Sequence, residues 1–347
     1  MKKSFLSILV VAAIIALGAT SCKKDDDVKP NPDVHVIGMQ SRKNNGAFTV
    51  KYWKNGVVEN WTSADEHNSD DASANALLVS GNDVYAAGYY WPLNSTSGNK
   101  RATYWKNGTP VFVSTEAQEA VLTGIAVVGS DVYVGGREEI GLGARARLWK
   151  NGTPITLVDD AYNSEVWCLT SSGTDVYACG RYGKFATYWK NGVATRLNDG
   201  TNYAVLMGMA ISGTNVYAIG YERDNTTQRD IAKYWKNGVG IALLKSSDIQ
   251  YDSYATRIVL SGNDVHILGT KDGAATYWKN GVETDISFTK SASTSLSGLA
   301  VVGSDVYFSG CQRFAPNKYM AKYWKNGVAV NLTDTAMAAY ASDIIVK

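Results

Sequence analysis

Three features of the sequence predict an all-β fold, a seven-bladed β-propeller with four antiparallel strands in each blade. The first is a repeated phrase, Tyr-Trp-Lys-Asn-Gly, which ends at Gly56, Gly108, Gly192, Gly238, Gly281 and Gly327. Residues 148–152 supply a seventh copy as Leu-Trp-Lys-Asn-Gly, and the Trp residues of the copies are 40 to 52 positions apart. Repeats of this length are typical of units that bury a core only by stacking on their neighbours. The other two features are a pair of hairpin signals in each repeat and two chain ends that complement each other.

The hairpin signals divide each repeat into four strands, named a, b, c and d in chain order. The first hairpin, as in residues 76–88, is an apolar strand, a glycine turn and a second strand that ends in glycine. The second hairpin turns at Asn107-Gly108 and its counterparts, and Asn-Gly tolerates the positive φ angles that a two-residue turn requires. Four short strands in about 40–50 residues indicate a propeller blade. A helical solenoid would need apolar residues at helical spacing over several turns, and the sequence has no such stretch.

The chain ends predict how the ring closes. Six complete sets of strands run from about residue 76 to residue 332. Residues 33–38 match strand b with no strand a ahead of them, and residues 343–346 look like a strand a with nothing after it. We expect a mixed blade made of the C-terminal strand a and the N-terminal strands b, c and d, which leaves no unpaired sheet edge. The propeller is therefore predicted over residues 34–347.

Residues 1–21 have the pattern of an export signal. Lys2 and Lys3 precede an apolar run, residues 5–17, that is too short to span a bilayer, because a spanning helix needs about 20 apolar residues. The small residues before Cys22 resemble a bacterial lipoprotein processing site, and the resemblance implies that Cys22 carries lipid. The alternative is an ordinary secreted protein in which Cys22 has no such role.

Residues 22–33 are expected to form a disordered acidic tether, because blocks of like charge are usually solvated. The Asp run directly after Cys22 resembles the surface-export tag of lipoproteins in some Gram-negative bacteria. The predicted location is therefore the outer membrane, with the protein exposed at the cell surface and attached to the membrane through its lipid anchor only.

The repeats resemble the extracellular HAF-type repeats, in which an aromatic residue and Asn-Gly precede a short apolar strand. They are more distantly similar to kelch blades, whose glycine pair at the end of strand b occurs here only as Gly135-Gly136. These resemblances imply the fold and say nothing about an activity.

Charge and composition exclude several function classes. The chain has 34 basic and 32 acidic residues, so removal of Lys2 and Lys3 with the signal leaves a neutral protein, which argues against nucleic acid as a partner. Three His are too few for a His-based metal cluster, and the oxygen-rich loop at residues 65–71 lacks the spacing of a calcium loop. No phosphate-binding glycine motif, nucleophile elbow or Cys-x-x-Cys occurs. The sequence thus predicts no cofactor and no metal site.

Loop lengths indicate which face of the ring binds a ligand. The b–c and d–a connections, which share one face, vary in length, and variable loops on a rigid scaffold are where binding usually occurs. We name this the variable-loop face, and the opposite side, with its uniform a–b and c–d turns, the turn face. Tyr, Trp and Arg, the residue types enriched at binding hot spots, gather beside the variable loops. The candidate ligand face consists of Tyr90, Trp91, Arg137, Trp167, Arg181, Tyr182, Tyr203, Tyr221, Arg223, Tyr254 and Arg313.

These side chains predict a surface for an uncharged or weakly charged partner, a glycan or a protein. The alternative is that the rings only fill space against the rim of the propeller. On the turn face, Asp occupies most a–b turns and Lys every c–d turn. Asp favours turns, so the interpretation that we favour is a turn-forming Asp and a solvated Lys.

Cys168 and Cys179 are expected to face each other across the first hairpin of one blade, where either a disulfide or two free thiols fits the spacing. The favoured function is a non-enzymatic binding or adhesion module on a monomeric lipoprotein. One alternative is a carbohydrate-active hydrolase or lyase using Asp159, Asp160, Glu165 and Arg257 at the channel mouth. The other is a lipoprotein that acts as an envelope scaffold.

Overall fold

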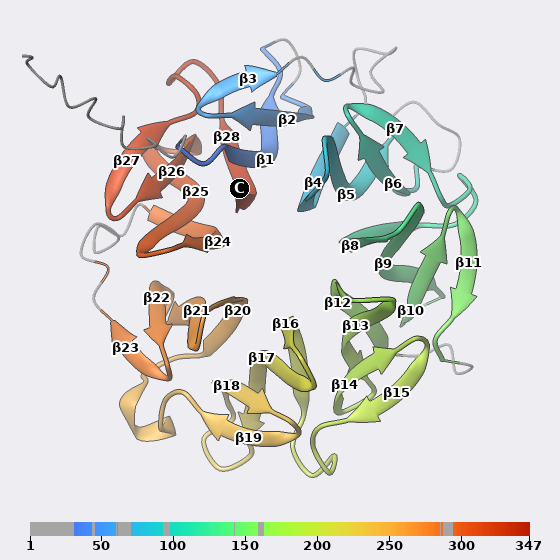
Figure 1. The fold of residues 1–347 in the computed structure, drawn as a ribbon, viewed down its shortest axis with the longest axis vertical. Helices are drawn as coiled ribbons and strands as arrows, with labels where there is room; N and C mark the ends of the chain where they lie inside the picture. The colour runs from blue at the N-terminus through green and yellow to red at the C-terminus, as the bar shows by residue number, and fades with distance from the viewer. Residues whose placement is uncertain are drawn as a thin grey trace, which may run out of the picture. The chain divides into compact units, whose positions relative to one another are not determined.

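The computed structural model describes residues 31–43, 46–59, 61, 71–92, 98–141, 143–158, 163–284, 286 and 294–347. The chain divides into a short unit, Met1–Pro32, and a compact unit, Asp33–Lys347. Within the described residues of the second unit, 28 strands form seven four-stranded antiparallel sheets arranged as a ring around a central opening (Figure 1). The predicted seven-bladed propeller is confirmed. No helix in the described part of the chain has the length and apolar character needed to cross a membrane.

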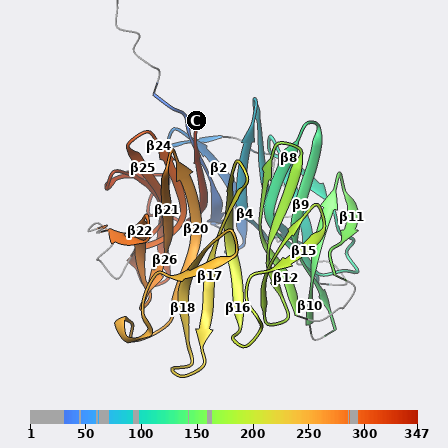
Figure 2. The same ribbon diagram turned by 60° about the horizontal axis from the view of Figure 1, so that its bottom comes forward.

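In each blade the four strands follow one another from the centre of the ring to its rim (Figure 1). Each single strand passes from one face of the ring to the other (Figure 2). The innermost strands, which are strand a of each blade, are β4 (Asp71–Ser80), β8 (Ala120–Val128), β12 (Ser164–Ser172), β16 (Ala204–Ser212), β20 (Ser253–Ser261), β24 (Thr294–Val302) and β28 (Ala339–Val346). Strand b is β5 (Asp83–Trp91), β9 (Asp131–Ile140), β13 (Asp175–Tyr182), β17 (Asn215–Asp224), β21 (Asp264–Lys271), β25 (Asp305–Ala315) and β1 (Val34–Ser41).

The outer half of each blade is the second hairpin. Strand c is β6 (Arg101–Lys106), β10 (Gly143–Lys150), β14 (Phe185–Lys190), β18 (Arg229–Lys236), β22 (Ala274–Lys279), β26 (Lys318–Lys325) and β2 (Phe48–Lys54). Strand d, at the rim, is β7 (Thr109–Phe112), β11 (Thr153–Thr156), β15 (Val193–Arg196), β19 (Val239–Ala242), β23 (Val282–Thr284), β27 (Val328–Asn331) and β3 (Val57–Glu59). The strand d residues are mostly exposed, so the core lies between the blades and not at the rim.

The closing blade combines the two ends of the propeller as predicted. Its strand order is β28-β1-β2-β3, and β1 and β28 are antiparallel, with Val34 opposite Val346 and Ile37 opposite Asp343. Figure 1 shows the C-terminal strand β28 beside the N-terminal strand β1. This pairing closes the ring with backbone hydrogen bonds and removes the free edge that strand b would otherwise expose.

The Trp of the repeated phrase is the main side chain between blades. All seven copies are between 0 and 4% exposed. Trp105, for example, lies in one hydrophobic cluster with Ile37, Val50 and Tyr52 of the preceding blade. Each repeat therefore contributes a large apolar wedge that is buried only when its neighbour is present, which explains why the phrase recurs once in every blade.

The Lys, Asn and Gly of the phrase form a bonded turn. Asn107 and Gly108 have φ angles of 49° and 85°, as a two-residue hairpin turn with two positive φ angles requires. The Asn107 side chain accepts a hydrogen bond from the backbone N–H of Val84 (2.8 Å) and donates one to Asp83 (2.8 Å). The Lys106 ammonium lies 2.8 Å from the other oxygen of Asp83. The second hairpin is thus fastened to the turn of the first.

This arrangement corrects the interpretation of the turn-face lysines as merely solvated. In six of the seven described blades the Lys Nζ lies 2.7–2.8 Å from an Asp carboxylate at the start of strand b. In five of them this Asp belongs to the a–b turn, and in the closing blade, which has no such turn, it is Asp33. In the remaining blade the Asp is replaced by Asn215, which accepts the hydrogen bond from Asn237 (2.8 Å). The hydrogen bond donated by the Asn side-chain amide of the c–d turn is therefore common to all these blades. In six of them the Lys–Asp ion pair is added to it.

Candidate ligand site at the mouth of the channel

A β-bulge interrupts strand a at the same point in each of the seven described blades. One residue of strand a has no partner on strand b there, which turns its side chain out of the regular alternation. The bulge residues are Asn75, Thr123, Trp167, Met207, Thr256, Ser297 and Ser342. All seven line one cavity in the centre of the ring.

The glycine that ends the first hairpin of every repeat is explained by this bulge. A Cβ atom on Gly180 would lie 1.9 Å from the backbone carbonyl oxygen of Glu165, which belongs to the facing strand a. The glycines of the other six described blades meet the corresponding carbonyl at 1.9–2.0 Å. Glycine is required here for close approach of two backbones and not for a positive φ angle.

The cavity has a volume of about 580 Å³, within the roughly 300–1,000 Å³ of small-ligand sites. Besides the bulge residues, its lining includes Tyr89, Lys100 and Arg137, which come from ends of strand b and the loops that follow. It therefore opens toward the variable-loop face. A smaller cavity of about 140 Å³, the inner cavity, shares five lining residues with it and continues along strand a toward the turn face.

Five of the bulge residues are polar, and three of them bond to the next blade. Asn75 donates to the carbonyl of Leu122 (2.8 Å), and Thr123 donates to that of Val166 (2.6 Å). Ser297 makes the same contact with the last blade of the ring. In each case the acceptor is the residue just before the neighbour's own bulge, so these side chains hold adjacent blades together.

Trp167 and Met207 depart from this pattern. They occupy the bulges of β12 and β16, which are neighbouring blades (Figure 1). Met207 has no hydrogen-bond donor, and the buried indole N–H of Trp167, although a donor, has no acceptor among the described residues. They form an adjacent apolar pair on one side of the cavity, and Tyr89 and Tyr340 supply further aromatic lining.

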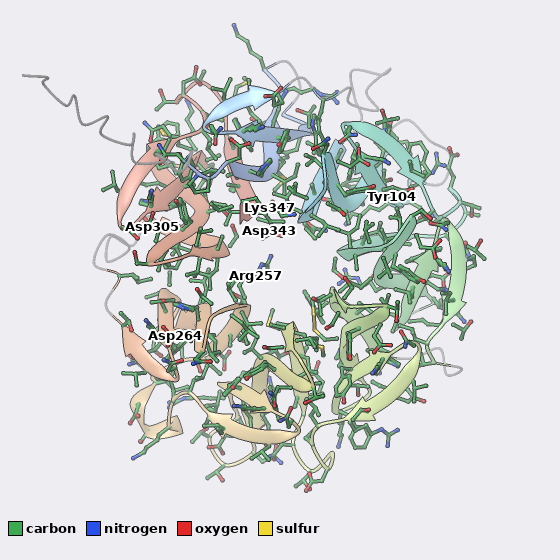
Figure 3. All side chains as sticks on the ribbon, in the orientation of Figure 1. Tyr104, Arg257, Asp264, Asp305, Asp343 and Lys347 are labelled. Carbon is green, nitrogen blue, oxygen red and sulfur yellow. A yellow bond between two sulfur atoms is a disulfide. The ribbon has the colours of Figure 1, made fainter. Side chains whose placement is uncertain are left out.

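Three basic side chains line the cavity: Lys100, Arg137 and Arg257. Among the described residues no carboxylate does so. Arg257 extends into the central opening (Figure 3), where its Nε lies 3.8 Å from an oxygen of Asp343.

Asp343 belongs to the lining of the inner cavity. Its carboxylate accepts hydrogen bonds from the backbone N–H groups of Leu77 and Ile344, at 3.0 Å each. Burial raises the pKa of Asp343, and the charge of Arg257 opposes that shift. The bond to Leu77 joins the last strand of the ring to β4 of the neighbouring blade.

Of the predicted ligand face, Arg137 and Trp167 line the cavity, and Trp91 stands beside it, with the Lys100 ammonium 5.5 Å from its ring centroid. Tyr90 instead lies in the hydrophobic core and is 7% exposed, with its ring against Phe112. Tyr90 is therefore largely inaccessible to a ligand. Successive side chains of a strand point to opposite sides, so Tyr90 points away from the side of Tyr89 and Trp91.

The other predicted residues lie outside the lining of the cavity. The Tyr221 ring packs between Tyr203 (6.2 Å between centroids) and Tyr254 (5.0 Å). Burial raises the pKa of both Tyr221 and Tyr254. Arg223 pairs with the buried Asp230 at 2.9 Å.

Arg181 is held in an ion pair with Glu165, at 2.7 Å. The Tyr182 ring lies under the guanidinium of Arg196, at 5.5 Å, and Arg313 is exposed. Glu165, one of the carboxylates considered for catalysis, thus has a partner and lines neither cavity. Asp159 and Asp160, like Cys22 and residues 62–70 of the acidic loop, lie outside the described residues.

The cysteines near the channel are not poised for chemistry. Cys168 and Cys179 pair directly across β12 and β13, with Cα atoms 5.2 Å apart, and are joined by a disulfide. Cys311 lines the cavity, and burial raises the pKa of its thiol to about 11, so it is protonated at neutral pH. Within the described residues no group of three His, Cys, Asp or Glu side chains is arranged to hold a metal ion.

Comparisons with known proteins agree with the fold. No family model matches the sequence, and no curated protein does either. Among solved structures, the chain is similar to the β-propeller domain of the Trilobed protease from Pyrococcus furiosus, with 11% identity and a TM-score of 0.53 over 88% of this chain and 97% of that one.

Two peptidases show a similar likeness. A puromycin-hydrolyzing peptidase of Mycobacterium tuberculosis has 10% identity and a TM-score of 0.52, over 86% of this chain and 53% of that one. The acylaminoacyl peptidase of Pyrococcus horikoshii has 12% identity and a TM-score of 0.52, over 88% and 52% respectively. The chain spans about half the length of these two peptidases. At such identities the likeness shows the fold alone.

Proposed function

We propose that this protein is a non-enzymatic binding module that holds a saccharide in the cavity at its variable-loop face. The observation that carries the proposal is the convergence of one bulge residue from every described blade on a single cavity. If the bulge residues served only to hold adjacent blades together, polar side chains could do so at all seven bulges. The neighbouring Trp167 and Met207 break that pattern and supply an apolar platform within a polar wall.

The chemistry of the lining suits a sugar ring. Indole and thioether side chains offer apolar surface to the C–H face of a pyranose, and the Tyr rings combine an apolar body with a polar tip. Asn75, Thr256 and Ser342 add polar atoms around the wall. Aromatic and apolar surface combined with placed polar groups is usual in a small-ligand pocket.

Binding is favoured over hydrolysis because of the carboxylates. A glycosidase needs two carboxyl groups about 5–10 Å apart across the scissile bond. In the described lining of the two cavities only Asp343 carries a carboxyl group. It is held by two backbone N–H groups and faces Arg257, so it has a structural role in closing the ring.

The test is a saccharide panel measured by calorimetry with the purified protein and two Trp variants. Trp167→Ala should weaken binding about tenfold or more, as truncation of a central aromatic hot spot does. Trp61→Ala is the matched control, because Trp61 is also half-buried but stacks on Tyr52 (5.0 Å) and lines neither cavity. Both variants should retain the far-UV circular dichroism of the parent. Equal losses in the two variants, or no ligand in the panel, would contradict the proposal.

We further propose that the propeller is a monomer displayed at the cell surface through lipid on Cys22. The support is the sequence alone: an export signal, a cysteine after small residues and an acidic run. The wild-type protein should partition into detergent with the membrane fraction and be cleaved by protease added to intact cells. Cys22→Ser should move the protein to the soluble fraction, and unchanged partitioning of that variant would contradict the anchor.

A further inference from the structure

We infer that the ligand of the cavity is an acidic saccharide, one that carries carboxylate or sulfate groups. This inference rests on the proposed function and names the chemical class of its ligand. Its basis is the charge of the lining, which holds Lys100, Arg137 and Arg257 and, within the described residues, no carboxylate.

Lys100 provides positive charge at the mouth of the cavity. Its ammonium lies 5.1 Å from the ring centroid of Tyr89 and 5.5 Å from that of Trp91, so two aromatic rings position it. In the described part of the chain it forms no ion pair with a carboxylate. An anionic group entering the cavity would give this ammonium the carboxylate-like partner that it lacks among the described residues.

Comparison with the next blade shows that Arg137 lacks the cross-strand carboxylate of its counterpart Arg181. Arg137 and Arg181 each follow the strand b glycine that faces a bulge, so they occupy equivalent positions. Arg181 lies opposite Glu165 and pairs with it, whereas the residue opposite Arg137 is Val121.

The Nε of Arg137 bonds to Glu139 at 2.8 Å, outside the cavity lining. Among the described residues its two terminal nitrogens have no acceptor. The Glu139 contact fixes one edge of the guanidinium and leaves the other edge available for a bidentate contact with two oxygens of an anionic group, such as a carboxylate or a sulfate.

Arg257 supplies the third charge at the boundary between the two cavities. It follows the bulge residue Thr256, and its Nη1 donates to the Thr256 carbonyl at 3.0 Å. The position after the bulge is alanine or glycine in several other blades, as at Ala76 and Gly124. Arg257 instead carries a long side chain that extends into the central opening and lines both cavities (Figure 3).

A neutral sugar would gain little from these groups. Closing a ligand over three cations removes water from them, and that cost is offset only when the ligand brings charge-assisted hydrogen bonds. An acidic sugar fits both the apolar and the basic part of the lining. Its ring can lie on Trp167 and Met207 while its anionic group contacts Lys100 or Arg137.

The experiment compares three tetrasaccharides by calorimetry with the full protein. Tetragalacturonate tests carboxylates alone, a sulfated chondroitin tetrasaccharide tests sulfates together with carboxylates, and maltotetraose is the neutral counterpart. At least one acidic sugar should bind ten times more tightly than maltotetraose or better. Raising the ionic strength from about 0.05 M to about 0.5 M should reduce this advantage severalfold, because salt screens partly exposed charges.

Two variants each remove one positive charge from the cavity lining, and a third removes a positive charge elsewhere on the same face as a control. Lys100→Gln and Arg137→Gln should each weaken acidic binding about tenfold and leave maltotetraose unchanged. Lys184→Gln removes a positive charge from the same face at an exposed position outside the cavity and should retain the parent affinity.

The outcomes separate this inference from the proposed function. If maltotetraose binds as tightly as the acidic sugars and Trp167→Ala abolishes its binding, the proposed function holds and the acidic ligand is wrong. If acidic sugars bind but Lys100→Gln and Arg137→Gln have no effect, the assignment of these residues is overturned. If neither class binds, the proposed function fails and the inference fails with it.

Discussion

Gly180→Ala should destabilise the protein far more than a glycine substitution in a turn. The added Cβ would lie 1.9 Å from the carbonyl oxygen of Glu165 and 2.8 Å from its carbon, and both are backbone atoms that cannot turn aside. Strands β12 and β13 must separate, or the bulge at Trp167 must be lost. Overpacking costs about 1–3 kcal/mol, and one or two weakened ladder hydrogen bonds add about 1 kcal/mol each. The expected loss in the free energy of unfolding is about 3–4 kcal/mol.

The matched control is Gly273→Ala, the same substitution at a glycine of the opposite kind. Gly273 has a φ angle of 77°, and no heavy atom lies within 4 Å of the position that the alanine methyl group would take. Only the left-handed backbone conformation opposes alanine there, at a cost of about 1 kcal/mol. Urea unfolding of both variants, followed by Trp fluorescence, gives the two free energies of unfolding by linear extrapolation.

Equal losses in the two variants would refute the reasoning, because they would mean that the close approach of two backbones does not require glycine at position 180. A loss near 3–4 kcal/mol in Gly180→Ala alone would support it. Since the same bulge aims Trp167 into the cavity, Gly180→Ala should also weaken ligand binding even where the variant stays folded.

Three further predictions concern the repeats and the disulfide. Trp105→Ala should lower the free energy of unfolding by about 3–5 kcal/mol, because Trp105 is 1% exposed between two blades; a loss under about 1 kcal/mol by urea unfolding would contradict its role. Hydrogen bonds from Lys106 and Asn107 hold the pKa of Asp83 below its usual value, so this contribution to stability is present above about pH 4 and lost as the pH falls through the lowered pKa. Asp83→Asn should therefore reduce the loss of stability on acidification, measured as the fall in melting temperature below about pH 4. The same fall in the variant and the parent would argue against the ion pair. Reduction of Cys168–Cys179 should cost about 2–3 kcal/mol and free two thiols for alkylation, counted by mass spectrometry; no change in mass after reduction would mean that the bond is absent.

Most of the fold follows from local sequence signals. Asn107-Gly108 and its counterparts predict the outer hairpins, and the structure has positive φ angles at both residues. The match of residues 343–346 to a missing strand a predicts the closing blade, whose register the structure confirms. These features are predictable because a two-residue turn depends on the residues within it, and a strand that lacks a partner must find one.

The site was predictable only in part, because the bulges are not visible in the sequence pattern. The unpaired residue turns its side chain out of the regular alternation of strand a, so the sequence alone does not show that Asn75 or Trp167 faces the channel. The structure places Tyr89 in the cavity lining and Tyr90 in the core. Lys100 was missed because a lysine in a loop has no pattern of its own. The available signal was the glycine at the end of strand b in every repeat, which indicates a close backbone approach.

The central claim is that the cavity beneath the variable loops is where this protein holds its ligand. A crystal structure of the protein with tetragalacturonate tests it most directly. We expect a sugar ring against Trp167 and Met207, with a carboxylate within hydrogen-bonding distance of Lys100 or Arg137. A sugar bound at the turn face or along the outer strands, with the cavity free of it, would contradict the account.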